Sequence, residues 1–406
     1  MRRLTVTAMG AKGDGIATGE AGSLHVAGVL PGEIIELDAL GSVISILTPS
    51  PDRVAPFCRH AGRCGGCKFQ HWAGPAYREW KHALVVAALA RVGLSPEVAP
   101  LIPATGDGRR RAVLHARFGR GKPELGFMAA RSHDIVDLDT CPVLVPALRD
   151  APDLARALIR PLAGLGKPVD VQVTATLAGL DVDLRGIGRV EPALRLTLAG
   201  LADRYDLARL SIHVDVVVER RAPLHRMGTA LVNAPPGGFL QATVAGEEAL
   251  AGLVQNGLGK ARRIVDLFCG AGPFALRLAA ERPVAAFDSD KPAVAAFLKA
   301  ARATPGLKPV TGEARDLFRR PLLAAELAGF DAAVLDPPRA GAEAQVRQLA
   351  ASRLSCLAYV SCDAGTFARD AAILVAGGWH LDRVTPVDQF AHSAHVELVG
   401  CFSRSR

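Results

Sequence analysis

The pattern of hydrophobic and polar positions divides the chain into a strand-rich first part and a last part in which strands and helices alternate. Over residues 1 to about 50, short alternating runs lie between closely spaced glycines, which predicts a small β-barrel. Apolar residues recur at helical spacing over 77–92 and stop at Gly93, which predicts an amphipathic helix. Residues 110–232 are rich in short β-branched runs, which predicts a second β-rich domain. Its predicted strands cover residues 112–118, 125–128, 169–175, 180–184 and 210–218.

From about residue 233 the pattern changes to strand followed by helix. A buried-strand run at 264–268 leads into a glycine turn and a short helix, and the strand at 284–288 leads into a helix at 291–302. Such alternation predicts a doubly wound α/β sheet, which binds its ligands at the carboxyl ends of the strands. Further strands are predicted at 331–335, 356–361 and 395–402. We therefore expect three domains, at residues 1–52, 53–232 and 233–406.

Composition excludes a membrane protein and a disordered one. The chain has 406 residues, of which 50% are hydrophobic and 22% charged, as in ordinary globular domains. The start has no continuous apolar segment, and no window reaches the roughly 18 uncharged apolar residues that a membrane span needs. We expect a cytoplasmic protein with no membrane partner.

Positive charge is concentrated in one stretch. The net charge is +8, and seven basic residues lie between 109 and 131 against a single acid, Glu124. This density predicts a surface that contacts nucleic-acid phosphates, although a solvated face without a partner would have the same composition. The seven are Arg109, Arg110, Arg111, Arg117, Arg120, Lys122 and Arg131.

Cysteines are grouped at metal-ligand spacing. Cys58, Cys64 and Cys67 form a Cys-x5-Cys-x2-Cys run among glycines, and Cys141 offers a fourth thiolate. In a long chain without a secretion signal, such a group indicates a metal site rather than a disulfide framework. Four thiolates can hold zinc or an iron-sulfur cluster, and spacing does not choose between them. The alternative is four unliganded thiols.

The glycine turn after the first strand of the α/β part indicates a nucleoside-containing ligand. Gly270 and Gly272 let the backbone approach a ligand closely, and Asp288, which ends the next strand, can accept hydrogen bonds from ribose hydroxyls. A dinucleotide oxidoreductase would use the same devices, but Ala275 stands where its fingerprint has a third glycine. The spacing favours S-adenosylmethionine, and the remaining alternative is a tight turn without a ligand.

Three polar residues at strand ends suggest methyl transfer to a ring carbon. Asp336 begins an Asp-Pro-Pro sequence that Arg339 follows, whereas methyltransferases acting on amino groups often place an aromatic residue there. Carbon 5 of a pyrimidine becomes nucleophilic only after another group adds to carbon 6, and a thiolate is suited to that addition. Cys362 follows a predicted strand among polar neighbours, and Glu397 enters the last strand among apolar residues. The alternatives without catalysis are that Cys362 is a core thiol and that Glu397 is a carboxylate paired with a basic neighbour.

Taken together, these motifs resemble the RNA uracil-5 methyltransferase family, which makes 5-methyluridine. The resemblance covers almost the whole chain and includes the element 238–241, the turn 266–272, and the sequences around Asp336, Cys362 and Glu397. The first 52 residues resemble the TRAM domain, an RNA-binding β-barrel. The resemblance implies that Cys362 is the nucleophile and Glu397 the base that removes the carbon 5 proton. It also implies an S-adenosylmethionine pocket lined by Gln241, Phe268, Gly270, Asp288 and Asp336, and a 4Fe-4S cluster on Cys58, Cys64, Cys67 and Cys141.

The implied fold is a Rossmann-like α/β class I methyltransferase domain preceded by a TRAM-like barrel and a β-rich central domain. Family members with both a TRAM domain and a cluster mostly act on large-subunit ribosomal RNA, so we expect 23S rRNA to be the substrate. We also expect a monomer. The same chemistry on transfer RNA and a non-catalytic RNA-binding protein are the alternatives. A cytosine-5 RNA methyltransferase would carry a cysteine directly after an Asp-x-Pro motif, where this chain has Arg339.

The chain departs from the family pattern beside the nucleophile. Asp363 follows Cys362 where the family usually has asparagine, and Asp288 stands in place of a glutamate. A carboxylate next to a thiol disfavours its ionisation, so we expect Asp363 to raise the pKa of Cys362.

Overall fold

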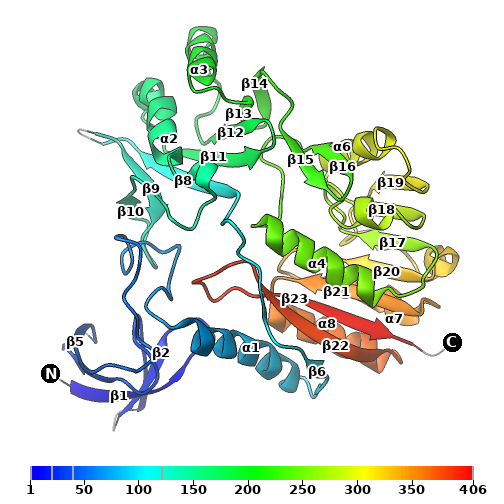
Figure 1. The fold of residues 1–406 in the computed structure, drawn as a ribbon, viewed down its shortest axis with the longest axis horizontal. Helices are drawn as coiled ribbons and strands as arrows, with labels where there is room; N and C mark the ends of the chain where they lie inside the picture. The colour runs from blue at the N-terminus through cyan, green and yellow to red at the C-terminus, as the bar shows by residue number, and fades with distance from the viewer. Residues whose placement is uncertain (1, 20–21, 39–40, 120–121, 405–406) are drawn as a thin grey trace.

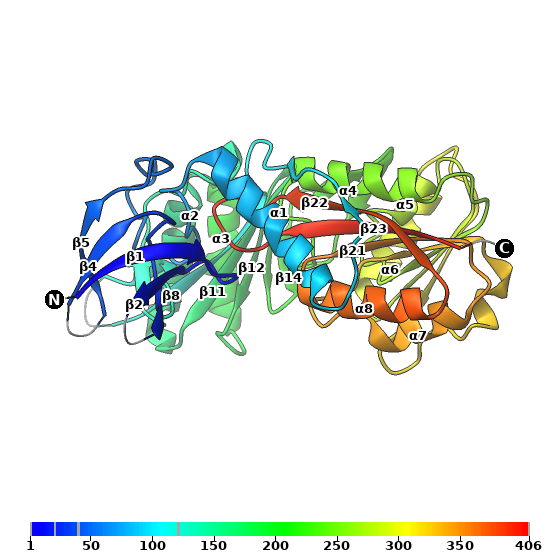
Figure 2. The same ribbon diagram turned by 90° about the horizontal axis from the view of Figure 1, so that it is seen from below.

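The structure is a computed structural model that describes residues 2–19, 22–38, 41–119 and 122–404. Among the described residues, three large sheets follow one another along the molecule, and a two-stranded sheet accompanies them (Figure 1). Figure 2 shows the N-terminal strands at one end and the C-terminal sheet at the other. Among the described helices, none is long and apolar enough to cross a membrane.

The N-terminal sheet has five antiparallel strands in the order β3-β2-β1-β4-β5. Alternate side chains such as Val6, Ala17 and Ile35 are buried in a small core of its own, as period-two patterning requires. The strand-rich character predicted for this segment is therefore confirmed. The strands are β1 (Arg2–Met9), β2 (Gly15–Gly19), β3 (Gly22–Val26), β4 (Ile34–Leu37) and β5 (Val43–Thr48).

The central sheet has seven strands in the order β10-β9-β8-β11-β12-β13-β14. The predicted strand at 210–218 is wrong, because His213 and Val214 adopt left-handed backbone angles and reverse the chain between two strands. The strands are β8 (Arg111–Arg117), β9 (Glu124–Met128), β10 (Ile135–Asp137), β11 (Val169–Thr176), β12 (Gly179–Arg185), β13 (Arg209–Ile212) and β14 (Asp215–Glu219).

Two helices in this region were not predicted, α2 (Ala151–Ile159) and α3 (Pro192–Arg204). Helix α2 has only nine residues, and α3 buries only Leu198 and Ala202. Helix α2 does bury Leu154, Ala155, Leu158 and Ile159 at helical spacing, but over too short a span to stand out, whereas α3 buries too few positions to mark it.

A segment from the first half of the chain packs on the C-terminal sheet. The predicted helix at 77–92 is confirmed as α1 (Gly74–Ala90), which packs against α8 (Ala364–Ala376). Strands β6 (Glu97–Val98) and β7 (Ile102–Pro103) pair with β22 (His380–Asp388). The domain boundaries at 52 and 232 stay predictions, and the structure adds that 74–103 lies against the C-terminal part.

The C-terminal sheet has nine strands in the order β19-β18-β17-β20-β21-β23-β22-β6, with β7 beside β22. Its first five strands are parallel, whereas β23 is antiparallel to both neighbours. Helices contribute to the core on each face, which confirms the predicted doubly wound α/β architecture. The remaining strands are β17 (Ile264–Leu267), β18 (Val284–Asp288), β19 (Val310–Ala314), β20 (Ala332–Leu335), β21 (Cys356–Ser361) and β23 (Glu397–Ser403). The hairpin β15 (Leu224–Met227) and β16 (Ala230–Asn233) and helices α4 (Val244–Gly257), α5 (Ala275–Leu278), α6 (Lys291–Arg302) and α7 (Glu343–Ala351) complete this part.

This topology brings the predicted functional residues to one edge. Asp288 ends β18, Asp336 follows β20, and Cys362 follows β21. The carboxyl ends of parallel strands meet at the same edge, and because β23 is antiparallel its first residue, Glu397, also lies there.

Candidate active site

The predicted catalytic and cofactor-binding residues line a single pocket of ≈ 490 Å³. Their strands and turns come from across the C-terminal half of the chain, and the sheet edge described above places them together. The set comprises Gln241, Phe268, Gly270, Asp288, Asp336, Cys362 and Glu397.

The glycine turn is shaped by close approach to its neighbours. Gly272 has a φ of 87°, and a Cβ there would lie 2.3 Å from the Phe297 ring, so only glycine fits. Gly270 has a φ of 51° and its N–H donates to Oδ2 of Asp288 at 2.8 Å. Oδ1 of Asp288 accepts from the Asp290 N–H at 2.8 Å. Asp288 is thereby fixed at the pocket wall, while each oxygen keeps a further lone pair for a ligand.

Side-chain amides connect the acids of the pocket. Gln241 donates from Nε2 to Oδ2 of Asp336 at 3.2 Å, and Gln389 donates from Nε2 to Oε1 of Gln241 at 2.6 Å. Gln389 also hydrogen-bonds Glu397, and its Oε1 accepts from the Ala242 N–H at 2.9 Å. The hydrogen bonds thus connect Glu397 with Asp336 through Gln389 and Gln241.

Burial keeps these acids closer to the neutral form than they would be in water. It raises the pKa of Glu397 to about 7, against the opposing effects of the Gln389 hydrogen bond and the Arg339 charge. It also raises the pKa of Asp336 well above its usual value, with a further contribution from Glu397. A carboxyl with a pKa near neutrality can take up and release a proton under physiological conditions.

Cys362 is half-buried and its thiol is a weaker acid than usual. Burial, together with the charges of Glu397 and Asp336, raises its pKa to about 11, and the charge of Arg339 opposes them. Asp363 is not among these causes, contrary to expectation, because it caps helix α8. Its Oδ1 accepts from the N–H groups of Gly365 and Thr366, each at 2.9 Å.

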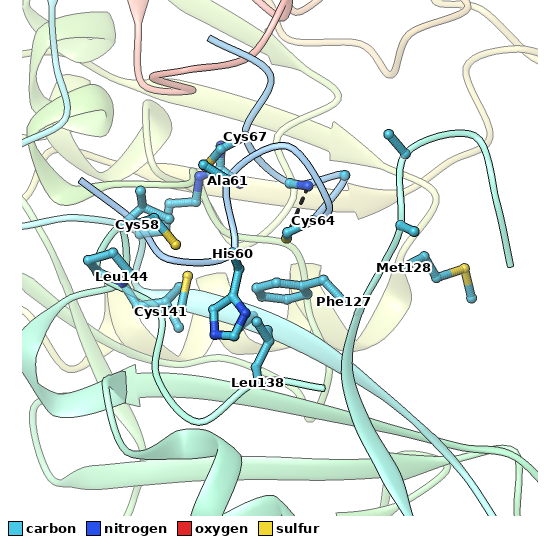
Figure 3. A pocket seen from close by; sticks show the side chains of 18 of the residues that line it. Cys58, His60, Ala61, Cys64, Cys67, Phe127, Met128, Leu138, Cys141 and Leu144 are labelled. Carbon is cyan, nitrogen blue, oxygen red and sulfur yellow. Dashed lines mark hydrogen bonds between the residues drawn. The ribbon is translucent and has the colours of Figure 1, made fainter. Parts of the chain in front are cut away.

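The four predicted metal ligands line a second cavity, of ≈ 430 Å³ (Figure 3). Cys58, Cys64 and Cys67 come from the loop before α1, and Cys141 comes from the segment after β10. The Gly66 N–H donates to Sγ of Cys64 at 3.5 Å. Within the described ranges, no three Cys, His, Asp or Glu side chains are grouped as ligands of one metal ion. The sequence-based prediction of a metal here stays a prediction.

Comparison with known proteins decides the family. No family model matches the chain. It is 44% identical over 407 residues to an uncharacterized RNA methyltransferase of Brucella suis, covering 100% of this chain and 98% of that protein. It is 35% identical over 430 residues to the 23S rRNA (uracil(1939)-C(5))-methyltransferase RlmD of Pseudomonas fluorescens, covering 100% and 94%. The chain belongs to the RNA uracil-5 methyltransferase family.

A solved structure has the same fold over the full length. The tRNA (uracil-54, C5)-methyltransferase of Pyrococcus abyssi, in complex with S-adenosyl-L-homocysteine, superposes with a TM-score of 0.74 over 98% of this chain and 99% of that one. At 22% identity this likeness concerns the fold alone. It confirms the α/β class I methyltransferase architecture expected for an RNA uracil-5 methyltransferase.

The basic surface predicted from the sequence is wrong in its details. Arg110 is buried, donating from Nε to the Gln241 carbonyl at 2.9 Å and forming an ion pair with Glu247. Arg111 donates to the Gly238 carbonyl at 3.0 Å and lies over the Phe239 ring. In this family member both arginines therefore pack against the pocket wall and do not form part of an exposed basic surface. Arg120 lies outside the described residues, and Arg131 pairs with Asp14 of the N-terminal sheet.

Basic residues gather instead around a groove of ≈ 720 Å³ that the sequence did not reveal. The groove shares Cys362, Phe390 and His395 with the active-site pocket, so the nucleophile candidate of this RNA methyltransferase lies where the two cavities meet. Each basic residue comes from a different segment, and only Arg109 belongs to the basic run that the sequence showed. They are Lys12, Lys68, Arg91 and Arg109.

Gln389 was also missed by sequence reasoning. It directly precedes the motif that carries Glu397 and is buried at 1% exposure. A buried amide needs hydrogen-bond partners, and a glutamine directly after the buried end of β22 was the available signal.

Proposed function

We propose that the protein transfers the methyl group of S-adenosylmethionine to carbon 5 of a uridine in 23S rRNA through a covalent adduct at Cys362. The observation that carries this proposal is the meeting of Cys362 and Glu397 in one pocket with the glycine turn and Asp288. A nucleophile, a base and a nucleoside-binding turn are the parts that this reaction requires.

The charge of the pocket suits the methyl donor. The described residues that line it include five acids, of which Glu247 is paired with Arg110, against one arginine, Arg339, and one histidine, His395. S-adenosylmethionine carries a sulfonium and an ammonium, which an acidic lining favours. Asp288 can accept hydrogen bonds from its ribose while the glycine turn allows close backbone approach. The five acids are Glu247, Asp288, Asp290, Asp336 and Glu397.

The donor's positive charge also helps ionise the nucleophile. Glu397 and Asp336 hold the pKa of Cys362 high, and a cation bound beside them offsets their charge. We therefore infer that donor binding lowers the pKa of Cys362 and prepares its thiolate for reaction.

The reaction then proceeds in four steps. The uridine is turned out of its RNA fold into the pocket. The Cys362 thiolate adds to carbon 6, and the ring electrons move to carbon 5, which takes the methyl group. Glu397 removes the carbon 5 proton, the ring electrons return, and the bond between sulfur and carbon 6 breaks. The thiolate is restored and one proton is released for each methyl group transferred.

The choice of RNA rests on a relative. The Pseudomonas fluorescens protein, named for a 23S rRNA uracil, matches nearly the full length of this chain. We propose that the N-terminal sheet is a TRAM-type RNA-binding barrel and that the groove containing Lys12 receives the RNA. Modification of transfer RNA is the alternative, and a map of 5-methyluridine in cells with and without the protein would separate the two.

We further propose that Cys58, Cys64, Cys67 and Cys141 hold a 4Fe-4S cluster. The four thiols line one cavity that also has apolar walls, including Phe127 and Leu138. Thiolates of cysteine are the ligands that hold such clusters. A bound cluster would tie the loop of the first three cysteines to the central domain.

Two variants test the mechanism with opposite expected outcomes. Cys362→Ala should form no covalent adduct with RNA, because no thiolate is present to attack carbon 6. Glu397→Gln should methylate the base and then stall, because the carbon 5 proton must leave before the thiolate can. With labelled S-adenosylmethionine, a denaturing gel should show a labelled protein–RNA band for Glu397→Gln and none for Cys362→Ala.

Cys356→Ala is the matched control. Cys356 is half-buried at the start of β21, the strand that leads to Cys362, and it does not line the pocket. This variant should turn over as the wild type does. Turnover by Cys362→Ala, or wild-type cycling by Glu397→Gln, would refute the assigned roles.

A further inference from the structure

A buried lysine from the first half of the chain holds the loop that leads to Glu397. The loop, residues 389–396, joins β22 to β23. Nζ of Lys81, on α1, donates to Oδ1 of Asp388 at 2.7 Å and to the carbonyls of Phe390 and His395 at 3.2 and 2.5 Å. These contacts lie at both ends of the loop.

The ammonium of Lys81 is fully used by these contacts. Its side chain has 0% exposure, and a lysine has three N–H donors, which match the three acceptors. Burial lowers the pKa of Lys81 to about 8 against the opposing charge of Asp388, so the ammonium prevails at neutral pH. A buried charge of this kind is rare unless it is paired, and here its partners all belong to one loop and the residue before it.

A second residue on the same face of α1 supports the loop. The Tyr77 hydroxyl, one helical turn before Lys81, donates to the Ser393 carbonyl at 3.1 Å. The N–H groups of Lys68 and Phe69 donate to the His392 carbonyl at 2.7 and 3.2 Å. The loop conformation is therefore set largely from outside the C-terminal sheet.

The same helix also contacts the element that carries the nucleophile. Helix α1 packs on α8, which begins two residues after Cys362. The loop that α1 holds carries Gln389, which hydrogen-bonds Glu397. Lys81 lines neither the pocket nor the groove. Its effect on the reaction must therefore act through the loop.

We propose that Lys81 is a positioning residue that holds loop 389–396 so that Glu397 faces carbon 5 of a uridine joined to Cys362. This inference rests on the proposed function. The step that depends most on Lys81 is removal of the carbon 5 proton and release of the RNA, whereas Lys81 itself lines neither the donor pocket nor the groove beside Cys362.

Two variants and one control test the role of Lys81. Lys81→Met removes the ammonium, and Lys81→Met with Asp388→Asn removes both charges, so that no buried carboxylate is left unpaired. Arg78→Met removes a positive charge from the exposed side of the same helix. Each rate is normalised to the fraction of protein that binds S-adenosylhomocysteine, so that unfolded protein does not count.

Both Lys81 variants should accumulate a methylated protein–RNA adduct and release it on the order of 100-fold more slowly than the wild type, as misplacement of a catalytic group predicts. Both variants should still bind S-adenosylhomocysteine, and Arg78→Met should resemble the wild type. A role in stability alone would lower the binding-competent fraction and leave the normalised release rate unchanged.

Two outcomes would overturn the role of Lys81. One is a normal release rate in the double variant. The other is a variant that loses both adduct formation and turnover. Failure of the proposed function has a different signature. In that case the wild-type protein itself would make no 5-methyluridine, or Cys362→Ala would remain active.

Discussion

At the scale of single residues, the active site is governed by how burial acts on acids of different kinds. Burial raises the pKa of Glu397 to about 7 and that of Cys362 to about 11. The first shift turns a carboxylate into a base that is effective near neutral pH, whereas the second leaves a thiol that needs help to ionise. We infer that the methyl donor provides this help.

The pKa of Glu397 predicts the pH dependence of adduct release. Because this pKa is raised, Glu397 stays protonated up to about pH 7, and only the deprotonated form can accept the carbon 5 proton. Release should therefore be fastest above pH 7 and fall about tenfold per pH unit well below it. Single-turnover release of methylated RNA, measured from acid to neutral pH, checks this expectation.

A variant at Gln389 tests whether the pH profile of release reports the pKa of Glu397. The hydrogen bond from Gln389 lowers the pKa of Glu397, so Gln389→Leu should move the midpoint of the release profile to higher pH. A release rate that does not change with pH, or a midpoint that moves to lower pH in this variant, would contradict Glu397 as the base.

At the scale of elements, neighbouring residues of one segment serve different parts of the molecule. Arg109 lines the groove, Arg110 pairs with buried Glu247, and Arg111 lies over Phe239. A run of charge in the sequence therefore does not become a charged face, because successive side chains of an extended segment point in different directions.

The cysteine loop predicts a linked loss of iron and of local order. Anaerobically purified protein should be brown and contain iron and sulfide in cluster stoichiometry. The Cys64→Ser variant should lose the colour together with its iron and sulfide. Limited proteolysis should then cut the loop between Cys58 and Cys67 more readily, because its tie to Cys141 is gone. Cys401→Ser, which alters a thiol of β23 outside this cavity, should behave like the wild type.

Two results would count against the cluster. One is colourless, active protein that contains a single zinc ion. The other is Cys64→Ser that keeps its full iron content.

At the scale of the whole molecule, the groove beside Cys362 is assembled from distant parts of the chain. Lys12 belongs to the N-terminal unit, Lys68 to the cysteine loop, and Arg91 follows α1. All three are exposed and border a cavity that reaches the nucleophile. This arrangement suits an RNA backbone that passes over the protein while one base enters the pocket.

Neutralising the three groove residues should weaken RNA binding and flatten its dependence on salt. Each lost phosphate contact removes roughly 0.7 to 0.9 from the slope of log K against log salt, so Lys12→Met with Lys68→Met and Arg91→Met should reduce the slope by about 2. The affinity for S-adenosylmethionine should not change. Binding titrations over a range of salt concentrations measure both quantities.

A second basic cluster provides the control. Lys260, Arg262 and Lys308 are exposed and lie together away from the groove. Changing these three to methionine removes the same charge and should leave the slope close to that of the wild type. An equal reduction in both triple variants would mean that net charge, and not the groove, attracts the RNA.

Local patterns in the sequence were enough to predict the α/β sheet, and the family resemblance added the residues of its site. Strands β18 and β21 and helix α6 have the predicted bounds, and all seven predicted catalytic and cofactor residues line one pocket. Period-two and helical spacing are properties of neighbouring residues, and the order of parallel strands brings their carboxyl ends together. Helix α2 escaped prediction because its apolar repeat spans only nine residues, and α3 because it buries only two. The turn at His213 escaped because it lacks the glycine or asparagine that usually marks left-handed backbone angles.

The sequence by itself therefore determined the succession of elements and the chemical groups at the strand ends. Only the tertiary structure decided which of those groups are buried and what they contact. Lys81 meets Asp388 across 307 positions, and Arg110 meets Glu247 across 137. Burial and long-range pairing set the pKa of Glu397 and the position of its loop, and both depend on packing between distant segments that no local pattern records.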